Sequence, residues 1–366
     1  MSTRVLVVDD TVVFRRVISQ ALAEIPGVEV VGTASTGKLA LSRLAALRPD
    51  LVTLDIEMPE MNGIEVLQAM KTAGMASQVI VLSALTVRGG ELTMRALDLG
   101  ALDFITKPDG GSTESNLALL RTRLQPMIRA FEQRRLIRDI LQRKPEQPTA
   151  AASATTVRTG GAQHQSRTVR RAGPPIVLIG VSTGGPAALA TLIPALPPDL
   201  AVPIFIVQHM PPLFTQPLAL SLANKSSIPV TEAQDNEIAL PNHAYIAPGG
   251  RQMKIMSDPR GAIVVRITDD PPENNCRPAV DYLFRSAALN FPGRATAVIL
   301  TGMGRDGTEG LKMLKRTGCS TIAQDESSSV VFGMPKEAIL AGVVDTVEPL
   351  DMIASAIVRS VRGGNI

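Results

Sequence analysis

The chain contains few residues of the kinds that mark several common classes of protein. It has 366 residues, no tryptophan, 3% aromatic residues and two cysteines, Cys276 and Cys319. Two cysteines in a chain of this length define no disulfide framework. Scarce aromatic rings argue against a surface that stacks nucleic-acid bases. The cores must be built from aliphatic side chains, as in parallel sheets covered by helices.

Long apolar runs are also missing. No stretch approaches the ~20 apolar residues that span a bilayer. The first residues lead directly into a short apolar strand, without the apolar region and cleavage site of a signal peptide. We therefore expect a cytoplasmic protein without membrane insertion.

A net positive charge is confined to one segment. The formal net charge is +3, but residues 1–110 carry −3, residues 174–366 carry −2 and residues 111–173 carry +8. This distribution argues against a nucleic-acid partner. Residues 142–173 have no hydrophobic periodicity, which predicts a flexible basic linker. A solvated linker is the simpler interpretation of the charge, and a docking strip for an acidic partner is the alternative.

The first 110 residues alternate between apolar runs and helical patterns, which predicts a parallel doubly wound sheet. An amphipathic pattern over 114–141 predicts one more helix. The predicted strands are 4–8, 28–34, 51–54, 78–82 and 102–105, and the predicted helices between them are 11–23, 36–47, 63–73 and 91–99.

Acidic residues follow two of these strands. Asp9 and Asp10 end the first strand and Asp55 ends the third, and these strands are neighbours in the order 2-1-3-4-5. Crowded carboxylates suit Mg²⁺, which would stabilise a phosphoryl group arriving on Asp55. Lys107, after the fifth strand, and Ser83, at the end of the fourth, offer a positive charge and a hydroxyl to the same group.

These residues, with Met58-Pro59, Asn62-Gly63 and Lys107-Pro108, resemble the response-regulator receiver family over the whole first 110 residues. The resemblance implies a flavodoxin-like receiver domain over residues 1–120, its last helix reaching about 141. It also implies that Asp55 accepts phosphate from a histidine kinase with Mg²⁺ bound, and that Phe104 is the aromatic switch residue beside Ser83 and Lys107.

Residues 174–366 predict a second, mainly parallel α/β unit with an inserted β-hairpin. The predicted strands are 176–180, 204–208, 296–300, 321–324 and 343–347, the predicted helices are 186–196, 213–226, 279–289 and 308–316, and the hairpin strands are 254–256 and 263–267.

A serine lies between the first strand and first helix of this unit. Residues 180–185, Gly-Val-Ser-Thr-Gly-Gly, fit the Gly-x-Ser-x-Gly pattern of a nucleophile on a sharp strand-to-helix turn. A glycine-rich phosphate cradle at a helix N-terminus is the rival interpretation. Ser182 is therefore a candidate nucleophile.

A serine nucleophile needs a base, and the chain has three histidines. His164 lies in the predicted linker and His243 in a turn. His209 follows the strand 204–208 and is the remaining candidate. Asp306, after the strand 296–300, is a candidate third member, with an ordinary helix N-cap as the alternative reading and Asp325 as a rival. The chain order Ser, His, Asp differs from the α/β-hydrolase order.

These segments, with Cys276-Arg277-Pro278-Ala279-Val280-Asp281 and Phe332-Gly333-Met334-Pro335, resemble the chemotaxis protein-glutamate methylesterase (CheB) family. The resemblance implies that residues 174–366 are a catalytic domain. It implies Ser182, His209 and Asp306 as the catalytic triad, with Met303 and Thr183 at the oxyanion and Arg277 as a substrate contact.

The same resemblance implies the reaction and its partners. It implies hydrolysis, without a cofactor, of glutamate γ-methyl esters on the cytoplasmic helices of a chemoreceptor, and deamidation of receptor glutamines. We expect the tethered receiver to inhibit the hydrolase until Asp55 is phosphorylated. A non-catalytic effector that binds DNA or protein and an esterase for small substrates are the alternatives.

Overall fold

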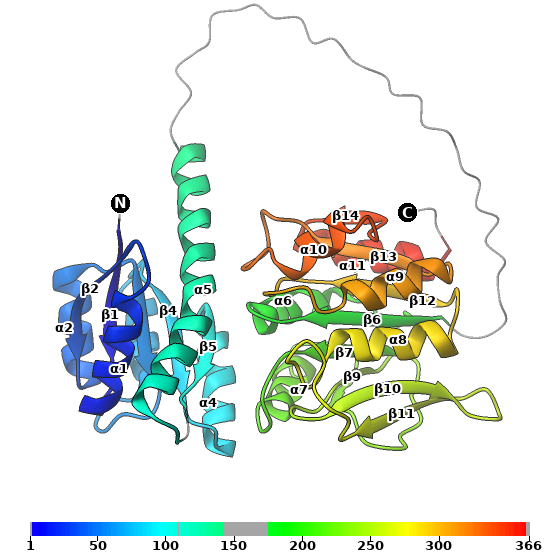
Figure 1. The fold of residues 1–366 in the computed structure, drawn as a ribbon, viewed down its shortest axis with the longest axis horizontal. Helices are drawn as coiled ribbons and strands as arrows, with labels where there is room; N and C mark the ends of the chain where they lie inside the picture. Colours follow the sequence, from blue (N-terminus) through cyan, green and yellow to red (C-terminus); the bar gives the residue numbers. More distant parts are fainter. Residues whose placement is uncertain (1, 109, 143–174, 364–366) are drawn as a thin grey trace, which may run out of the picture.

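The computed structural model describes residues 2–108, 110–142 and 175–363. Figure 1 shows two α/β units beside one another, each built on its own sheet. The segment predicted as a linker, 142–173, lies outside the described residues except for its first residue.

The N-terminal unit contains a five-stranded parallel sheet in the order β2-β1-β3-β4-β5, which confirms the predicted receiver topology. The strands consist mainly of buried aliphatic side chains, as expected for a sheet covered on both faces. Their bounds are β1 Thr3–Val8, β2 Val28–Ala34, β3 Leu51–Asp55, β4 Gln78–Ser83 and β5 Asp103–Thr106.

Five helices cover the two faces of this sheet. One apolar cluster joins the sheet to α2, α3 and α4, and another joins it to α1 and α5. Helix α4 begins four residues before the predicted start because Thr86 caps it, accepting a hydrogen bond from the Gly89 N–H at 2.8 Å. The bounds are α1 Val12–Ala23, α2 Gly37–Leu47, α3 Gly63–Thr72, α4 Val87–Asp98 and α5 Thr113–Gln142.

The C-terminal unit contains a seven-stranded sheet in the order β14-β13-β12-β6-β7-β9-β8, and every pair in it is parallel. The predicted hairpin forms a separate antiparallel pair, β10 with β11. The sequence did not predict β8 and β9, which have three residues each. The bounds are β6 Ile176–Val181, β7 Ile204–Gln208, β8 Val230–Glu232, β9 Ala244–Ile246, β10 Gln252–Ser257, β11 Ile263–Thr268, β12 Ala295–Ile299, β13 Ser320–Gln324 and β14 Thr346–Glu348.

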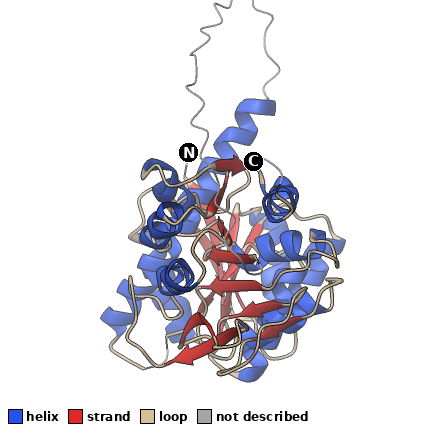
Figure 2. Ribbon diagram, turned by 90° about the vertical axis from the view of Figure 1, so that its right-hand side faces the viewer, coloured by secondary structure: helices blue, strands red, loops and turns tan. Residues whose placement is uncertain are grey.

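Helices lie on both faces of this sheet, as the view in Figure 2 shows. Helices α6, α7 and α11 pack on one face, and α8, α9, α10 and the hairpin pack on the other. Helices α10 and α11 were not predicted. The bounds are α6 Gly185–Leu192, the 3₁₀ helix η1 Ile193–Ala195, α7 Thr215–Ala223, α8 Val280–Asn290, α9 Thr308–Arg316, α10 Met334–Leu340 and α11 Leu350–Val361.

The strand order decides which loops meet. Strands β7, β6 and β12 are adjacent and parallel, so their carboxyl ends lie at one edge of the sheet. The residues that follow these three strands include Ser182, His209 and Asp306. Three segments far apart in the chain therefore supply one site.

The core on one side of the C-terminal sheet depends on α8, which gives a test of the fold. Phe284 is fully buried there, whereas Leu289 on the same helix is 69% exposed. We expect Phe284→Ala to lower the free energy of unfolding of this unit by about 3–5 kcal/mol, because it leaves a cavity. Leu289→Ala should change it by less than about 0.5 kcal/mol. Urea unfolding of both variants checks this, and equal midpoints would contradict the packing.

Candidate active site

Ser182 lies in the turn between β6 and α6. Its N–H donates to the Thr301 carbonyl at 3.0 Å, which ties this turn to the loop after β12. Gly184 has φ 75°, and a Cβ there would lie 2.4 Å from Val330, so both the backbone conformation and the space require glycine. The turn therefore holds the serine at the carboxyl end of the sheet.

A second glycine lets the loop after β12 approach the serine. A Cβ on Gly302 would lie 2.7 Å from the Cβ of Ser182 and 2.4 Å from the Met334 sulfur. Thr301 fixes this loop, because its hydroxyl donates to the Thr183 carbonyl at 2.9 Å. Gln208 fixes the other side, because its amide donates to the carbonyl oxygens of Ser182 and His209 at 2.9 and 3.1 Å.

His209 follows β7 and points its Nε2 at Asp306. The distance from Nε2 to Asp306 Oδ2 is 2.7 Å, and Nδ1 lies 3.6 Å from the Cys276 sulfur. Burial disfavours the imidazolium, but the bonds to Asp306 and Cys276 outweigh it and raise the pKa of His209 to about 9. Because Asp306 holds Nε2, Nδ1 is the nitrogen that remains for proton transfer.

The Asp306 carboxylate is buried and accepts hydrogen bonds on both oxygens. Besides His209, its donors include the N–H groups of Val280, at 2.6 Å, and Asp281, at 3.0 Å, which begin α8. Burial raises the pKa of this carboxyl, but His209 and the backbone donors outweigh it, so the pKa lies below its usual range. Asp306 is not the N-cap of α9, whose N-cap is Gly307. It stays charged and orients the imidazole.

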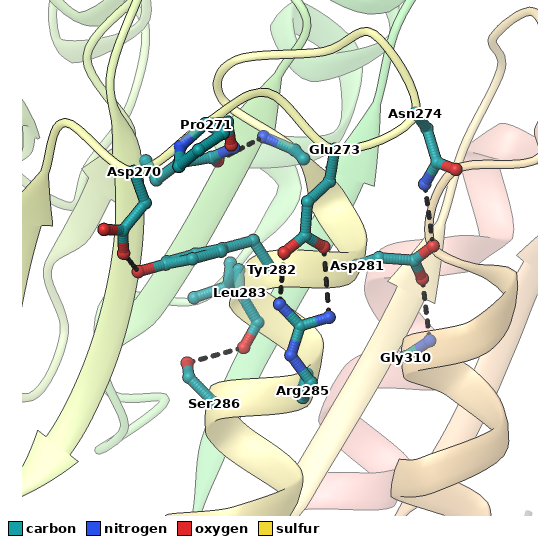
Figure 3. A network of polar contacts seen from close by, with 12 residues as sticks. Asp270, Pro271, Glu273, Asn274, Asp281, Tyr282, Leu283, Arg285, Ser286 and Gly310 are labelled. Carbon is teal, nitrogen blue, oxygen red and sulfur yellow. Dashed lines mark hydrogen bonds and ion pairs between the residues drawn. The ribbon is translucent and has the colours of Figure 1, made fainter.

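A second buried carboxylate, that of Asp281, lies next to Asp306. Asn274 donates to Asp281 and to Asp306, both at 2.9 Å, and Asp281 also accepts from the Gly310 N–H at 2.7 Å. Burial and the neighbouring Asp306 charge raise the pKa of Asp281 to about 6. Figure 3 shows Asn274, Asp281 and Gly310 in this chain of contacts. The sequence offered no signal for the role of Asn274, which depends on its position in the folded loop.

The loop that carries Asn274 is anchored to α8. Tyr282 donates to Asp270, and Arg285 pairs with Glu273, with 3.0 Å between Nη1 and Oε2. Figure 3 shows both contacts on the side of α8 that faces the loop. These contacts also position Cys276 and Arg277, which follow Asn274 in the same loop.

All the predicted site residues of the C-terminal unit except Asp306 border one cavity of about 340 Å³. No hydrogen bond joins Ser182 and His209 within the described part of the chain. Asp325, the rival third member, instead binds Ser327 and Ser328 at the end of β13. His243 stacks on Tyr245 with 4.4 Å between ring centroids. The predicted residues that line the cavity are Ser182, Thr183, His209, Arg277 and Met303.

The N-terminal unit brings its predicted acidic residues together. Oxygens of Asp9, Asp10 and Asp55 lie within 4.8 Å of one another. Lys107 Nζ lies 2.8 Å from Asp9 and 2.6 Å from Asp55. Burial raises the pKa of Asp55 to about 6, although Lys107 opposes this. Ser83 is buried and donates to the Gly89 carbonyl of α4 at 3.1 Å. This oxygen-rich set fits a hard divalent cation such as Mg²⁺.

The two units meet at the cavity. Asp103 at the start of β5 accepts a hydrogen bond from the Gly184 N–H at 2.7 Å. Phe104 stacks on Phe214, with 5.0 Å between ring centroids. Met94 of α4 packs into the core of the C-terminal unit. The N-terminal residues that line the cavity are Asp103, Phe104, Ile105, Thr106, Arg123, Pro126 and Met127.

Comparisons with known proteins identify the family of each unit. The family model described as CheB methylesterase matches residues 177–357, and the model described as response regulator receiver domain matches residues 5–113. A protein-glutamate methylesterase/protein-glutamine glutaminase of Desulfotalea psychrophila is 49% identical over 98% of each chain. One of the same name from Nocardioides sp. is 43% identical over 97% of this chain and 94% of the relative.

The chain belongs to the CheB methylesterase family. A solved CheB methylesterase catalytic domain from Thermotoga maritima is 42% identical, with a TM-score of 0.50, and covers 51% of this chain and 99% of that one. In this CheB-family chain, the receiver places Asp103 and Phe104 directly beside the turn that carries Ser182. The resemblance to receivers implied that Phe104 is a switch residue, which stays a prediction, but the sequence gave no sign of the contact that Asp103 makes.

The His209–Asp306 pair predicts a measurable pKa change. We expect the pKa of His209 in the full chain to be about 9. Asp306→Asn should lower it, because burial still disfavours the imidazolium while the charged carboxylate that stabilises the imidazolium is lost. NMR titration of the imidazole nitrogens measures both values. Asp325→Asn is the matched control, and a larger effect of that variant would make Asp325 the partner.

Proposed function

We propose that the chain is a phosphorylation-regulated hydrolase that acts on glutamate γ-methyl esters of chemoreceptors and releases methanol. It also deamidates receptor glutamines, since an amide carbonyl undergoes the same attack. The observation that carries the proposal is the 2.7 Å bond between His209 and Asp306, bordering the same cavity as Ser182. The CheB-family relatives named for both activities support it.

In this mechanism Ser182 attacks the ester carbonyl while Nδ1 of His209 takes its proton. Asp306 fixes the imidazole by holding Nε2 and stabilises the imidazolium that forms. Methanol leaves with the proton from His209, and a glutamyl ester of Ser182 remains. Water then hydrolyses this ester by the reverse proton transfers, which regenerates the serine and releases the carboxylate product.

The developing oxyanion needs N–H donors near Ser182. We assign this role to the backbone of Thr183, beside the nucleophile, and of Met303, because Gly302 lets its loop approach the serine closely. Arg277 is exposed at the rim of the cavity, where it contacts an incoming receptor helix. Met303 is 44% exposed and offers an apolar contact to the same helix.

The arrangement of the two units corresponds to an inhibited form. Asp103 and Phe104 of the receiver line the same cavity as Ser182, and in our proposal they keep a receptor helix from reaching it. With a pKa of about 9, His209 is protonated at neutral pH and is a poor base in this form. Burial raises the pKa of Asp103 to about 6. Its carboxylate accepts a hydrogen bond from the Gly184 N–H, and so lies close to the nucleophile.

Phosphorylation opens this form in our proposal. A histidine kinase supplies the phosphoryl group to Asp55. Asp9, Asp10 and Asp55 would hold Mg²⁺, which would neutralise charge on the phosphoryl group. Lys107 and Ser83 bind the new phosphoryl oxygens, so the hydroxyl of Ser83 leaves the Gly89 carbonyl. Lys107 and Phe104 belong to one short segment, so the movement of Lys107 also displaces Phe104 and disturbs its stacking on Phe214.

The receptor substrate places the enzyme in the cytoplasm. Within the described residues, no helix is long and apolar enough to cross a membrane.

We assign residues 1–120 to the receiver, with its last helix extending to about 141, residues 142–173 to the linker and 174–366 to the catalytic domain. A linker keeps the receiver at a high effective concentration beside the hydrolase, so a modest interface is sufficient for inhibition.

Methanol release from a methylated receptor fragment tests the catalytic assignment. Ser182→Ala and His209→Ala should each lower kcat by roughly three to six powers of ten, because the triad acts as a unit. His243→Ala, which changes a histidine outside the cavity, should keep activity within about twofold of the wild type. Full activity of Ser182→Ala would exclude this mechanism, and turnover of small esters alone would point to another substrate.

The interface between the units gives a test of regulation. Phe104→Ala should raise methanol release without any phosphodonor, by roughly tenfold for each 1.4 kcal/mol of lost interface energy. Acetyl phosphate should stimulate the wild type but not Asp55→Asn. Leu39→Ala removes a partly exposed apolar side chain of α2, which lies outside the interface, and should leave basal release unchanged. Equal basal rates for Phe104→Ala and wild type would contradict inhibition by the receiver.

A further inference from the structure

The loop before α8 places a thiol beside the catalytic imidazole. Cys276 is a free cysteine of intermediate burial, and its Sγ lies 3.6 Å from His209 Nδ1. Hydrolysis as described above does not use this sulfur. One ligand atom each of His209, Cys276 and Asp306 lie within 4.8 Å of one another. Imidazole, thiolate and carboxylate are the ligand types that bind zinc in proteins.

The separation of sulfur and nitrogen suits one tetrahedral metal ion. Zn–S bonds of about 2.3 Å and Zn–N bonds of about 2.05 Å, at a tetrahedral angle, place the two ligand atoms about 3.5 Å apart. The observed separation of Cys276 Sγ and His209 Nδ1 is 3.6 Å. The observed separation is therefore the one expected for two atoms that bind the same zinc ion.

Asp306 contacts Nε2 of the imidazole, on the opposite side of the ring from Cys276. Its Oδ2 already accepts from His209 Nε2 and Val280 N–H, and its Oδ1 accepts from Asn274, Asp281 and Gly307. It is therefore a poor direct ligand. A carboxylate that holds the far nitrogen of a histidine is the usual support of a metal-binding histidine, because it fixes the ring and raises its basicity.

We propose that Cys276 Sγ and His209 Nδ1 form an inhibitory site for Zn²⁺, with Asp306 orienting the imidazole. Because His209 and Cys276 both line the cavity, water from it would complete the coordination of the ion. Zinc binding releases the proton of the Cys276 thiol and the proton on His209 Nδ1 to water. The ion then occupies the lone pair that His209 needs for proton transfer, so Ser182 loses its base. The proposal that zinc binds rests on geometry alone. The proposal that zinc inhibits hydrolysis also rests on the proposed role of His209 as the base.

Metal binding can be measured without hydrolysis. Co²⁺ added to the full chain, with excess Mg²⁺ to fill the acidic site of the receiver, should give a thiolate-to-cobalt charge-transfer band that Zn²⁺ abolishes. Cys276→Ala should remove the band and weaken Zn²⁺ binding by more than the roughly 10–100-fold that loss of a supporting partner costs. Asp306→Asn should weaken binding within that smaller range.

The other cysteine is the matched control. Cys319 is free and 4% exposed in the core, so Cys319→Ala should bind Co²⁺ and Zn²⁺ as the wild type does. An unchanged band in Cys276→Ala, or its loss in Cys319→Ala, would overturn the site.

Methanol release at buffered free Zn²⁺ tests inhibition. The half-inhibitory zinc concentration should equal the dissociation constant in the wild type and should rise with it in Cys276→Ala. Zinc bound through Cys276 without loss of methanol release would leave the metal site standing and would contradict the role of His209 as the base.

Discussion

The hydrogen bond between His209 and Asp306 is the interaction on which the rest of this site depends. Asp306 is a buried charge, and such a charge is stable only if hydrogen bonds replace the water that it loses. Backbone N–H groups at the start of α8, the Gly307 N–H and the Asn274 amide supply them. The site thus requires α8, the loop before it and the loop after β12 to be in place together, which is why it draws on most of the C-terminal unit.

The same end of the sheet also binds the receiver. At the start of β5, Asp103 accepts a hydrogen bond from Gly184 in the turn that carries Ser182, and Phe104 stacks on Phe214. Lys107, which contacts Asp55 at 2.6 Å, follows within four residues. A charge that develops on Asp55 is therefore linked through one stretch of backbone to the residues that close the active site. Regulation needs no long path between the two sites.

In our two proposals, the imidazole of His209 takes part in two kinds of chemistry, proton transfer and the binding of zinc beside Cys276. The carboxylate that orients His209 for proton transfer also prepares its free nitrogen as a metal ligand. The nitrogen can bind only one partner at a time, so proton transfer and zinc binding exclude each other. Three residues of the loop before α8 thus have different parts in the site. Asn274 donates a hydrogen bond to the carboxylate of Asp306, Cys276 carries the thiol, and Arg277 lies at the rim of the cavity.

The sequence by itself determined the two α/β units and most of their strands, because aliphatic runs bounded by turns have few other stable arrangements. It also indicated Ser182, His209, Asp306 and Asp55 as site residues, because polar residues after parallel strands meet at one edge of a sheet. It missed β8, β9, α10 and α11, which are short or lack a clear period, and β8 and β9 gain their hydrogen bonds from neighbouring strands. Only the tertiary structure decided which nitrogen of His209 faces Asp306, that Asn274 and Asp281 support that carboxylate, and that Asp103 reaches Gly184. These contacts join residues that are far apart in the chain, and the free energy of a buried hydrogen bond depends on its surroundings in the fold rather than on local sequence.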